Sequence, residues 1–398
     1  MMSLKYILPA LAASQMVFAS SDDCGDTKIK TQSDADGINT CSTISGDITI
    51  DESYSGDLIL SGIEKITGGL SCSEGANVSS ITASELTSIG KTFDLEGLTT
   101  LTLLDFAQLD SVGSINWDAL PKLQSLNFAK GVTEAGDVSI TNTGLTDLNG
   151  ISLQTVGLFS IQNNRDLKTI NINNLKNATK SISFSGNYDT LEVNFPNLGT
   201  GVGMTFQNIS AVSLPSLEKL TGQLGFWGTK FETFSAPNLT QTGDLIFKDN
   251  TKLSNISMPV LKTVNGGFTI ARDDELNIIS LSNLETVKGA IDFSGTFNKV
   301  SLGALKDVEG AFNMQSTHGN FSCSDFKKLK TEDVIKGKFS CNATNDNPTT
   351  ANGTSGTGSG TSTGSGSSST SSGAAFFTGA NVPVVGIAAF FGALASFL

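Results

Sequence analysis

Apolar residues recur along this chain with a period of about 22 positions. Between residues 217 and 310, each copy opens on an anchor leucine, and a glycine follows four or five places later. Beyond the glycine, apolar residues stand two and four places on, as in Phe268 and Ile270 or Ile291 and Phe293. Such alternation predicts a short strand with one buried face. A copy this short cannot bury that face alone, so the repeats predict a stacked solenoid.

The repeat extends over most of the chain, with a mean spacing of 22 residues between anchors. Thirteen positions serve as anchors: Cys41, Ile63, Leu86, Leu109, Val132, Leu153, Leu175, Leu198, Leu217, Leu239, Leu261, Leu284 and Leu305. A glycine follows twelve of them: Gly46, Gly68, Gly90, Gly113, Gly136, Gly157, Gly203, Gly222, Gly243, Gly266, Gly289 and Gly310. A glycine fixed at one corner predicts either a positive φ or a close approach of stacked coils.

These features predict an all-β fold, a right-handed parallel β-helix or leucine-rich-repeat-like solenoid of about 22-residue coils. The pattern lacks the strict asparagine of ordinary leucine-rich repeats and has few helix-favouring stretches. We therefore expect mainly strand, without the helices that back a horseshoe. On this interpretation Leu261→Ala removes core volume and costs about 2–5 kcal/mol.

The N-terminal residues 1–19 are typical of a secretory signal peptide. Lys5 precedes an apolar run over residues 6–13, and Val17-Phe18-Ala19 offers a cleavage site before Ser20. The run is short and is interrupted by Pro9, which disfavours a membrane anchor. The solenoid ectodomain then covers residues 20–341.

The C-terminal part of the chain predicts a lipid anchor. Residues 342–373 are rich in Ser, Thr and Gly and are predicted to form a flexible stalk. Residues 374–398 follow as a propeptide with an apolar end, which is typical of a GPI-attachment signal. We expect attachment at Gly373, with Ser371, Ser372 and Ala374 as alternatives. A tail-anchored helix is the other interpretation, but the terminal apolar run is short.

The five cysteines lie mostly where the ends of the solenoid need caps. We expect disulfides Cys24–Cys41 and Cys323–Cys341, each closing a short loop in a secreted chain. Cys72 occupies an inward strand position, which favours a buried thiol. Pairing of Cys41 with Cys72 is the alternative.

Eight Asn-X-Ser/Thr sequons make several N-glycans an expectation for a secreted chain. They start at Asn77, Asn177, Asn208, Asn238, Asn255, Asn320, Asn342 and Asn352.

Charge and motifs narrow the function. The net charge is −13 with 25 Lys and Arg against 38 Asp and Glu, which argues against nucleic acid as a partner. P-loop, zinc and dinucleotide motifs are absent from the sequence, so we expect no cofactor and no metal site. His318 is the one histidine of the chain, and its setting predicts a turn residue rather than a catalytic base.

A β-helical enzyme acting on polysaccharide is the main catalytic alternative. Such an enzyme needs paired carboxylates about 5–10 Å apart on adjacent coils. Asp273-Asp274-Glu275 supplies carboxylates, but the matching corners hold Asp249-Asn250 and Gly295. We therefore interpret this stretch as a solvated acidic corner without catalytic function.

The two tryptophans fall in different phases of the repeat. After Gly113, Trp117 takes an inward position and is predicted to lie in the core. After Gly222 the inward positions are Leu224 and Phe226, so Trp227 is predicted to face outward. An outward tryptophan is a candidate surface contact for a sugar ring or a protein. The alternative is an indole folded down over neighbouring coils.

Taken with the predicted signal, stalk and anchor, the repeats LKTVNGGFTI, LETVKGAIDF and LKDVEGAFNM make the chain resemble a known family. It is similar to the fungal GPI-anchored cell-wall organisation proteins, the "extracellular mutant" family with its sporulation-specific relatives, whose ectodomain resembles the receptor L domain. The resemblance implies a glycoprotein of the cell membrane's outer face and the cell wall, required for wall integrity and morphogenesis. It supplies no catalytic residues. The expected partners are wall polysaccharide or wall glycoproteins, with the membrane reached through the lipid. A receptor-like ligand-binding module is a third interpretation.

Overall fold

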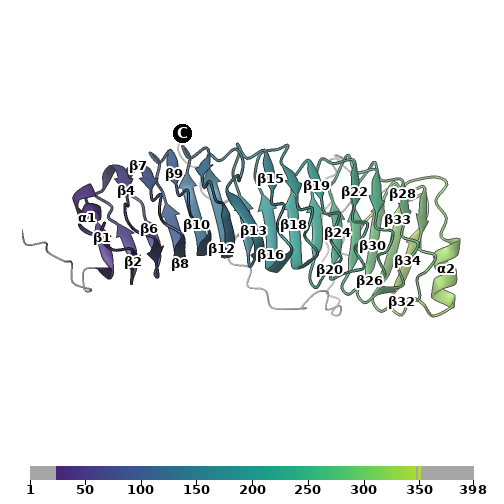
Figure 1. Ribbon diagram of the computed structural model, residues 1–398. Helices are drawn as coiled ribbons and strands as arrows, with labels where there is room; N and C mark the ends of the chain where they lie inside the picture. The colour runs from purple at the N-terminus through teal and green to yellow at the C-terminus, as the bar shows by residue number, and fades with distance from the viewer. Residues whose placement is uncertain (1–23, 347, 351–398) are drawn as a thin grey trace, which may run out of the picture. The chain divides into compact units, whose positions relative to one another are not determined.

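The computed structural model describes residues 24–346 and 348–350. Within these residues the chain winds into a stack of similar coils, and strands of successive coils lie side by side (Figure 1). The described strand pairs are parallel, as in Phe268 with Ile291 and Ile291 with Phe312. Each coil passes three faces in turn. The first face precedes the repeat glycine, the second follows it, and the third lies beyond the next corner. The predicted parallel solenoid is confirmed.

The first two faces belong to one 23-stranded sheet. The first face contains β2 (Thr43–Ile44), β5 (Lys65–Ile66), β13 (Ile151–Val156), β20 (Lys219–Leu220), β23 (Gln241–Thr242), β26 (Thr263–Val264), β29 (Thr286–Val287) and β32 (Asp307–Val308). The second face contains β1 (Thr27–Ile29), β3 (Ile48–Ile50), β6 (Leu70–Cys72), β14 (Phe159–Gln162), β21 (Leu224–Trp227), β24 (Leu245–Lys248), β27 (Phe268–Ala271), β30 (Ile291–Gly295), β33 (Phe312–Ser316) and β34 (Phe339–Asn342).

Five longer strands run through the glycine corner, and the third face forms four small sheets. The longer strands are β8 (Ser88–Glu96), β10 (Ser111–Leu120), β12 (Val132–Thr143), β16 (Asn177–Ser185) and β18 (Thr200–Gln207). The third face contains β4 (Ser55–Ile59), β7 (Asn77–Thr82), β9 (Leu103–Asp105), β11 (Leu126–Asn127), β15 (Thr169–Asn171), β17 (Glu192–Asn194), β19 (Ala211–Ser213), β22 (Thr233–Ser235), β25 (Asn255–Ser257), β28 (Ile278–Ser280) and β31 (Lys299–Ser301).

The interior is a continuous apolar core, as the period predicts. All thirteen anchor side chains are at most 5% exposed. Phenylalanines stack between coils, and the rings of Phe206, Phe226 and Phe247 are 5.5 Å and 5.2 Å apart, centroid to centroid. Trp117 is fully buried, as predicted. Each coil therefore buries its apolar face against its neighbours.

The repeat glycines are explained by close approach. A Cβ on Gly289 would stand 2.5 Å from the carbonyl carbon of Gly266, and one on Gly310 would stand 2.5 Å from that of Gly289. Such distances leave no room for a side chain between stacked coils. None of the twelve predicted glycines has a positive φ. Of the two explanations offered by the sequence, close approach is confirmed and positive φ is wrong.

Positive φ occurs instead at the corner between the second and third faces. Six consecutive coils place a residue there with φ between 56° and 66°: Asn163, Gly186, Asn208, Gly228, Asp249 and Arg272. Asn, Asp and Gly adopt this conformation at low energy. Because several residue types fill the corner, the sequence alone did not reveal it.

Buried amides satisfy the main chain just beyond this corner. Oδ1 of Asn164 accepts hydrogen bonds from the main-chain N–H and the hydroxyl of Thr143, at 2.9 Å and 2.6 Å. Asn250 makes the same pair of bonds with Thr229. Buried polar groups need such partners. A partial asparagine ladder therefore exists, although the sequence lacks the strict repeat.

Two helices close the described stack, α1 (Gln32–Gly37) near its start and α2 (Ser324–Thr331) near its end (Figure 1). The first begins in a capping box, in which Asp34 accepts a hydrogen bond from the Thr31 N–H at 2.8 Å. Phe326 of the second is buried against the core, with its ring 5.4 Å from that of Phe312. These helices cover the ends that a solenoid otherwise exposes.

Candidate functional site

Trp227 ends strand β21 on the outer side of the second face. Leu224 and Phe226 of the same strand are fully buried, whereas Trp227 is partly exposed. Successive side chains of a strand point to opposite sides, so the phase of the repeat places Trp227 outside the core. The outward position agrees with the prediction from the sequence.

The indole of Trp227 reaches back over Gly225 of its own strand. The ring atoms Cη2 and Cζ3 of Trp227 stand 2.2 Å from the place that a Cβ on Gly225 would occupy. Neighbouring strands carry Thr205 and Ile246 at this register position. Because Gly225 has no side chain, it leaves the space that the indole ring occupies, and any other residue at this position would fill that space. The role of Gly225 was not predicted from the sequence, although its place two residues before an outward tryptophan was a usable signal.

Polar groups surround the seated indole. Gln207 and Lys248 flank Trp227 on the two adjacent strands. Beside Gly225, Nε2 of Gln223 donates to Oγ1 of Thr205 at 3.2 Å. An aromatic ring with polar side chains on the adjacent strands suits a sugar, which offers an apolar C–H face and peripheral hydroxyls. We refer to Trp227, Gly225, Gln207, Gln223 and Lys248 as the indole platform.

A trough follows the glycine corner across earlier coils. Two contiguous hollows of about 530 and 410 Å³ share Ala135, Gly136 and Thr155. Bulges lie in the strands that form it, for example between Val112 and Ser114 of β10. Bulges re-aim side chains and often occur near binding sites.

One charged pair marks the wall of this trough. Nζ of Lys180 lies 2.8 Å from Oδ2 of Asp137, and the Leu158 N–H donates to Oδ1 at 2.8 Å. Burial alone would raise the pKa of Asp137, but these two donors outweigh it and hold the pKa below its usual range. The trough therefore presents a stable carboxylate beside an ammonium group.

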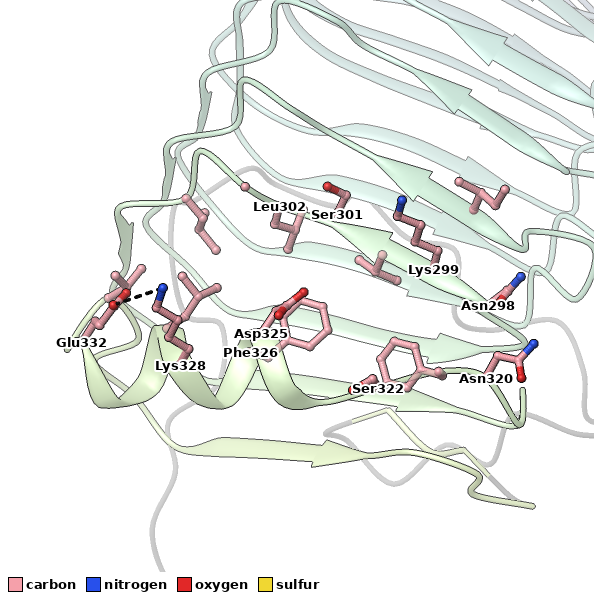
Figure 2. A pocket seen from close by; sticks show the side chains of 17 residues that line it. Asn298, Lys299, Ser301, Leu302, Asn320, Ser322, Asp325, Phe326, Lys328 and Glu332 are labelled. Carbon is pink, nitrogen blue, oxygen red and sulfur yellow. Dashed lines mark ion pairs between the residues drawn. The ribbon is translucent and has the colours of Figure 1, made fainter.

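A separate groove lies at the C-terminal end of the third face, between β31 and α2 (Figure 2). Its volume is about 670 Å³. Lys299 and Ser301 on the strand lie across from Asp325 and Phe326 on the helix. The repeat pattern gives no sign of this groove, because α2 interrupts the coil period.

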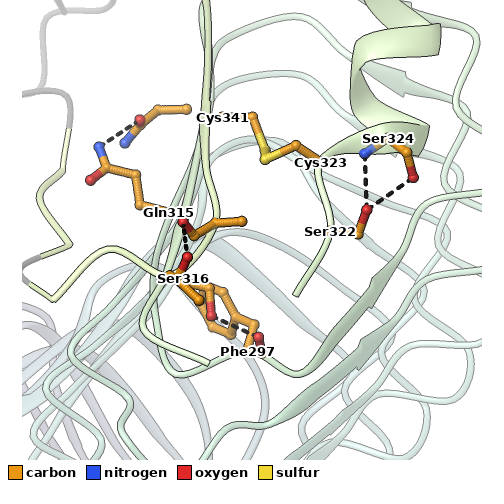
Figure 3. The surroundings of a disulfide bond; sticks show 10 residues. Phe297, Gln315, Ser316, Ser322, Cys323, Ser324 and Cys341 are labelled. Carbon is orange, nitrogen blue, oxygen red and sulfur yellow. Dashed lines mark hydrogen bonds between the residues drawn. A yellow bond between two sulfur atoms is a disulfide. The ribbon is translucent and has the colours of Figure 1, made fainter. Parts of the chain in front are cut away.

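The structure joins the cysteines in the expected pairs. Cys24 is bonded to Cys41, and Cys323, next to the start of α2, is bonded to Cys341 on β34 (Figure 3). Cys72 is a buried free thiol on the inner side of β6, and burial raises its pKa to about 12. The alternative pairing of Cys41 with Cys72 does not occur. A thiol with so high a pKa is unreactive at neutral pH.

The acidic corner differs from its prediction. Asp274 and Glu275 are exposed, but Asp273 is fully buried, so a solvated corner is wrong for Asp273. The reason is its place in the amide ladder, where its Oδ1 accepts the main-chain N–H of Asn250 at 2.7 Å. Burial raises the pKa of Asp273 to about 8, against the lowering effect of that N–H.

Arg272 forms an ion pair with Asp249 and not with the buried carboxyl of Asp273. Its Nη2 lies 2.6 Å from Oδ2 of Asp249, and this pair raises the pKa of the guanidinium further. His318 accepts a hydrogen bond from the Asn320 N–H at 3.2 Å, as expected of a turn residue. Within residues 24–346 and 348–350, no three His, Cys, Asp or Glu side chains are grouped to hold a metal ion.

Most sequons that the structure describes present their asparagine to solvent. Asn177 is intermediate, whereas the following six are exposed: Asn77, Asn208, Asn238, Asn255, Asn320 and Asn342. Asn208 is next to the indole platform, since its main-chain N–H donates to the carbonyl of Trp227 at 3.0 Å. A glycan at Asn208 would therefore extend close to the indole.

Several predicted segments lie outside the described residues. These are the signal peptide at 1–19, Asn352, most of the stalk, and the attachment sites Ser371, Ser372, Gly373 and Ala374. Neither helix of the described part is long and apolar enough to span a membrane.

Comparison with known proteins places the chain among fungal surface proteins. A family model described as "GPI-anchored cell wall organization protein" matches residues 1–39, and a "BspA type Leucine rich repeat region" matches 87–212 and 203–290. "Protein ecm33" of Aspergillus fumigatus is 59% identical over 99% of both chains. "Cell surface GPI-anchored protein" of Arthroderma benhamiae is 40% identical over 88% of this chain and 90% of its own length. "Cell surface GPI-anchored protein ECM33" of Candida albicans is 31% identical over 83% and 81%.

Proposed function

Because the chain belongs to the Ecm33 family of fungal GPI-anchored cell wall organization proteins, we propose that it holds wall polysaccharide on the outside of its solenoid. It is a protein of the cell surface and cell wall, and its role is in cell wall organisation. The relatives' names give the location and the process. The indole platform supports the choice of a sugar chain as the contact.

We propose that this role is non-catalytic. The relatives are named as cell wall and cell surface proteins. The carboxyl of Asp273 has a pKa suited to acid catalysis, but it is fully buried under the coil stack, where a polymer cannot reach it. The alternative of a β-helical polysaccharide-modifying enzyme would need exposed, paired carboxylates on adjacent coils.

The observation that carries the proposal is the seat of Trp227 on Gly225. A tryptophan that only filled a gap in the core would point inward with Phe226. Instead, the ring lies outside, supported from below and bordered by Gln207 and Lys248. A rigid aromatic surface costs little entropy when a ligand stacks on it. The platform therefore suits repeated contact with a polymer of sugar rings.

Binding to insoluble wall polysaccharide tests the proposal. The secreted protein is incubated with particles of fungal β-glucan, chitin or mannan, and the bound fraction is measured as a function of particle concentration. We expect Trp227→Ala to weaken retention on one of these by roughly thirtyfold, the factor that a central tryptophan worth about 2 kcal/mol supplies. Its thermal midpoint should change little, since the ring lies outside the core.

Two further variants separate a sugar-binding platform from other roles. Gly225→Ala keeps the tryptophan but displaces the ring, so it should weaken retention as Trp227→Ala does. Asn208→Gln removes the adjacent sequon and should leave retention on the polysaccharide intact. If the effect of Trp227→Ala disappears in the Asn208→Gln background, the indole packs on the protein's own glycan, and the polysaccharide contact is refuted.

The proposed anchoring follows from the ends of the sequence. We propose cleavage of residues 1–19, a Ser/Thr/Gly-rich stalk over 342–373 whose first residues, as far as Thr349, still bond to the last coil, and lipid attachment at Gly373 with removal of 374–398. The names of the relatives, which include "GPI-anchored", support this organisation. The stalk would hold the solenoid away from the membrane, where its faces meet the wall.

A further inference from the structure

The edge strands at the two ends of the third face differ in whether their outward main-chain groups have hydrogen-bond partners. At the N-terminal end, the edge strand is β4, and the Leu60 N–H donates to Thr82 of the neighbouring coil at 2.8 Å. Main-chain groups of a strand alternate in direction, so those of Ile59 point away from β7. The side chain of Gln32 meets them, accepting from the Ile59 N–H at 3.0 Å and donating to its carbonyl at 2.9 Å. A side-chain amide thus replaces the missing strand.

The C-terminal edge strand, β31, has no such replacement. The Lys299 N–H donates to Asn277 at 3.2 Å, and the Ser301 carbonyl accepts from Leu281 at 3.1 Å, so both residues face β28. Val300 lies between them and by the same alternation directs its N–H and C=O away from β28. Among the described residues, no group pairs with Val300 on that side.

The space beyond Val300 is the groove between β31 and α2. In a regular coil a third-face strand would stand there, but the chain forms α2 instead (Figure 2). Leu302, Leu305 and Phe326 line the groove and are nearly fully buried. Val300 remains partly exposed, although Ile279, its partner on β28, is 0% exposed. The groove therefore opens along the edge of β31 at Val300.

Both walls of the groove are fixed in place. The disulfide from Cys323 to Cys341 ties the start of α2 to β34 (Figure 3). The ring of Phe326 packs on that of Phe312. On the strand side, β31 is paired with β28 over three residues. A gap held open between fixed walls favours binding, since neither wall must rearrange.

We propose that this groove binds an extended polypeptide segment of a partner protein, which adds to β31 as a further strand. The occupant is a peptide because a strand edge offers alternating N–H and C=O groups, which another main chain matches. This site is separate from the indole platform and does not depend on it.

The charges at the rim indicate what the segment should carry. Lys299 borders the strand side and Asp325 the helix side. Lys328 and Glu332 pair with each other at 3.7 Å at one end. A segment with alternating apolar residues and little net charge fits this mixed rim. The chain's own third-face strands have this character, as in Glu275-Leu-Asn-Ile-Ile-Ser-Leu-Ser-Asn283.

The test uses that nine-residue peptide as the probe. A fluorescent copy of residues 275–283 is titrated with the secreted protein, and its anisotropy is recorded. We expect saturable binding of this peptide and none of a scrambled peptide of the same composition. The titration is repeated with Asn320→Gln, so that a glycan at the end of the groove does not hide the site.

Two variants locate the binding. Val300→Pro removes the N–H that faces the groove and leaves the pairing with β28, and it should weaken binding by about tenfold, the worth of one hydrogen bond. Gly303 lines the groove, and a Cβ on it would meet no atom within 4 Å, so Gly303→Phe should fill the space and abolish binding. Lys180→Ala, in the distant trough, is the control. Equal binding by wild type and both groove variants, or by the scrambled peptide, would overturn the proposal.

Discussion

The main-chain N–H of Asn250 donates a 2.7 Å hydrogen bond to Oδ1 of Asp273 in the following coil. Asn250 itself occupies the equivalent place one coil earlier, and its Nδ2 donates to the carbonyl of Phe226 at 3.3 Å. Asp273 has no such donor, and its Oδ2 is buried without a hydrogen-bond partner among the described residues. Asp273 thus places a carboxyl group at a position that earlier coils fill with the amide side chain of an asparagine.

Replacing Asp273 with asparagine should stabilise the protein at neutral pH. The folded-state pKa is about 8 and the ordinary value is 3.8. Folding therefore favours the protonated form, and stability falls as the pH rises from the ordinary value toward the folded value. Asp273→Asn should abolish this decrease in stability between pH 3.8 and about pH 8. Urea unfolding over a series of pH values measures it, with the exposed Asp274→Asn as control. An unchanged pH dependence in Asp273→Asn would contradict the assignment.

The glycine corner should not accept a methyl group. Gly289→Ala places a Cβ 2.5 Å from the backbone of Gly266 and should lower the free energy of unfolding by about 1–3 kcal/mol, as overpacking does. Gly303→Ala is the matched control, since its Cβ meets open space. Thermal unfolding of the two proteins gives the comparison. Equal midpoints would show that the coils do not approach so closely.

Whole coils should be removable, and half coils should not. Deletion of residues 262–284 brings Leu245 beside Ile291, so the apolar positions stay in register. Deletion of 262–272 places polar residues in the core. We expect secretion of the first variant and retention of the second inside the cell, measured by blotting medium and lysate. Equal secretion of both would argue against a register shared by successive coils.

The cap disulfides should appear in peptide maps prepared without reduction. Linked peptides should contain Cys24 with Cys41 and Cys323 with Cys341, whereas Cys72 should be alkylated only after unfolding. Loss of the C-terminal bond in Cys323→Ser should lower stability by about 3 kcal/mol, the value typical of a short closed loop. Rapid alkylation of Cys72 in the native protein would contradict its buried position.

The anchor can be tested at the C-terminus. Truncation after Gly373 should release the protein into the medium, because the proposed attachment signal is removed. Treatment of membranes with a phosphatidylinositol-specific phospholipase should release the full-length protein. Detection of residues 382–398 in the mature protein by mass spectrometry would show that the propeptide is retained and the anchor absent.

The repeating part of this fold follows from the sequence alone. The period of the anchors determines which side chains face inward, because a solenoid places equivalent positions in columns. The position of each tryptophan within the repeat is enough to predict that Trp117 lies in the core and Trp227 outside it. The cysteines near the two ends of the solenoid predict the disulfide-bonded caps. The fixed position of the repeat glycines shows that the backbone is constrained at this corner. The sequence left two explanations open, a positive φ and a close approach of stacked coils.

Tertiary structure decided what depends on contacts between neighbouring coils. The seat of Trp227 on Gly225, the burial of Asp273 beneath an exposed neighbour, and the left-handed corner filled by several residue types have no periodic signature. The groove at β31 exists because one coil forms a helix where the period calls for a strand. Periodicity determines the columns of a solenoid, whereas its special sites arise where one coil departs from the average and only packing shows the consequence.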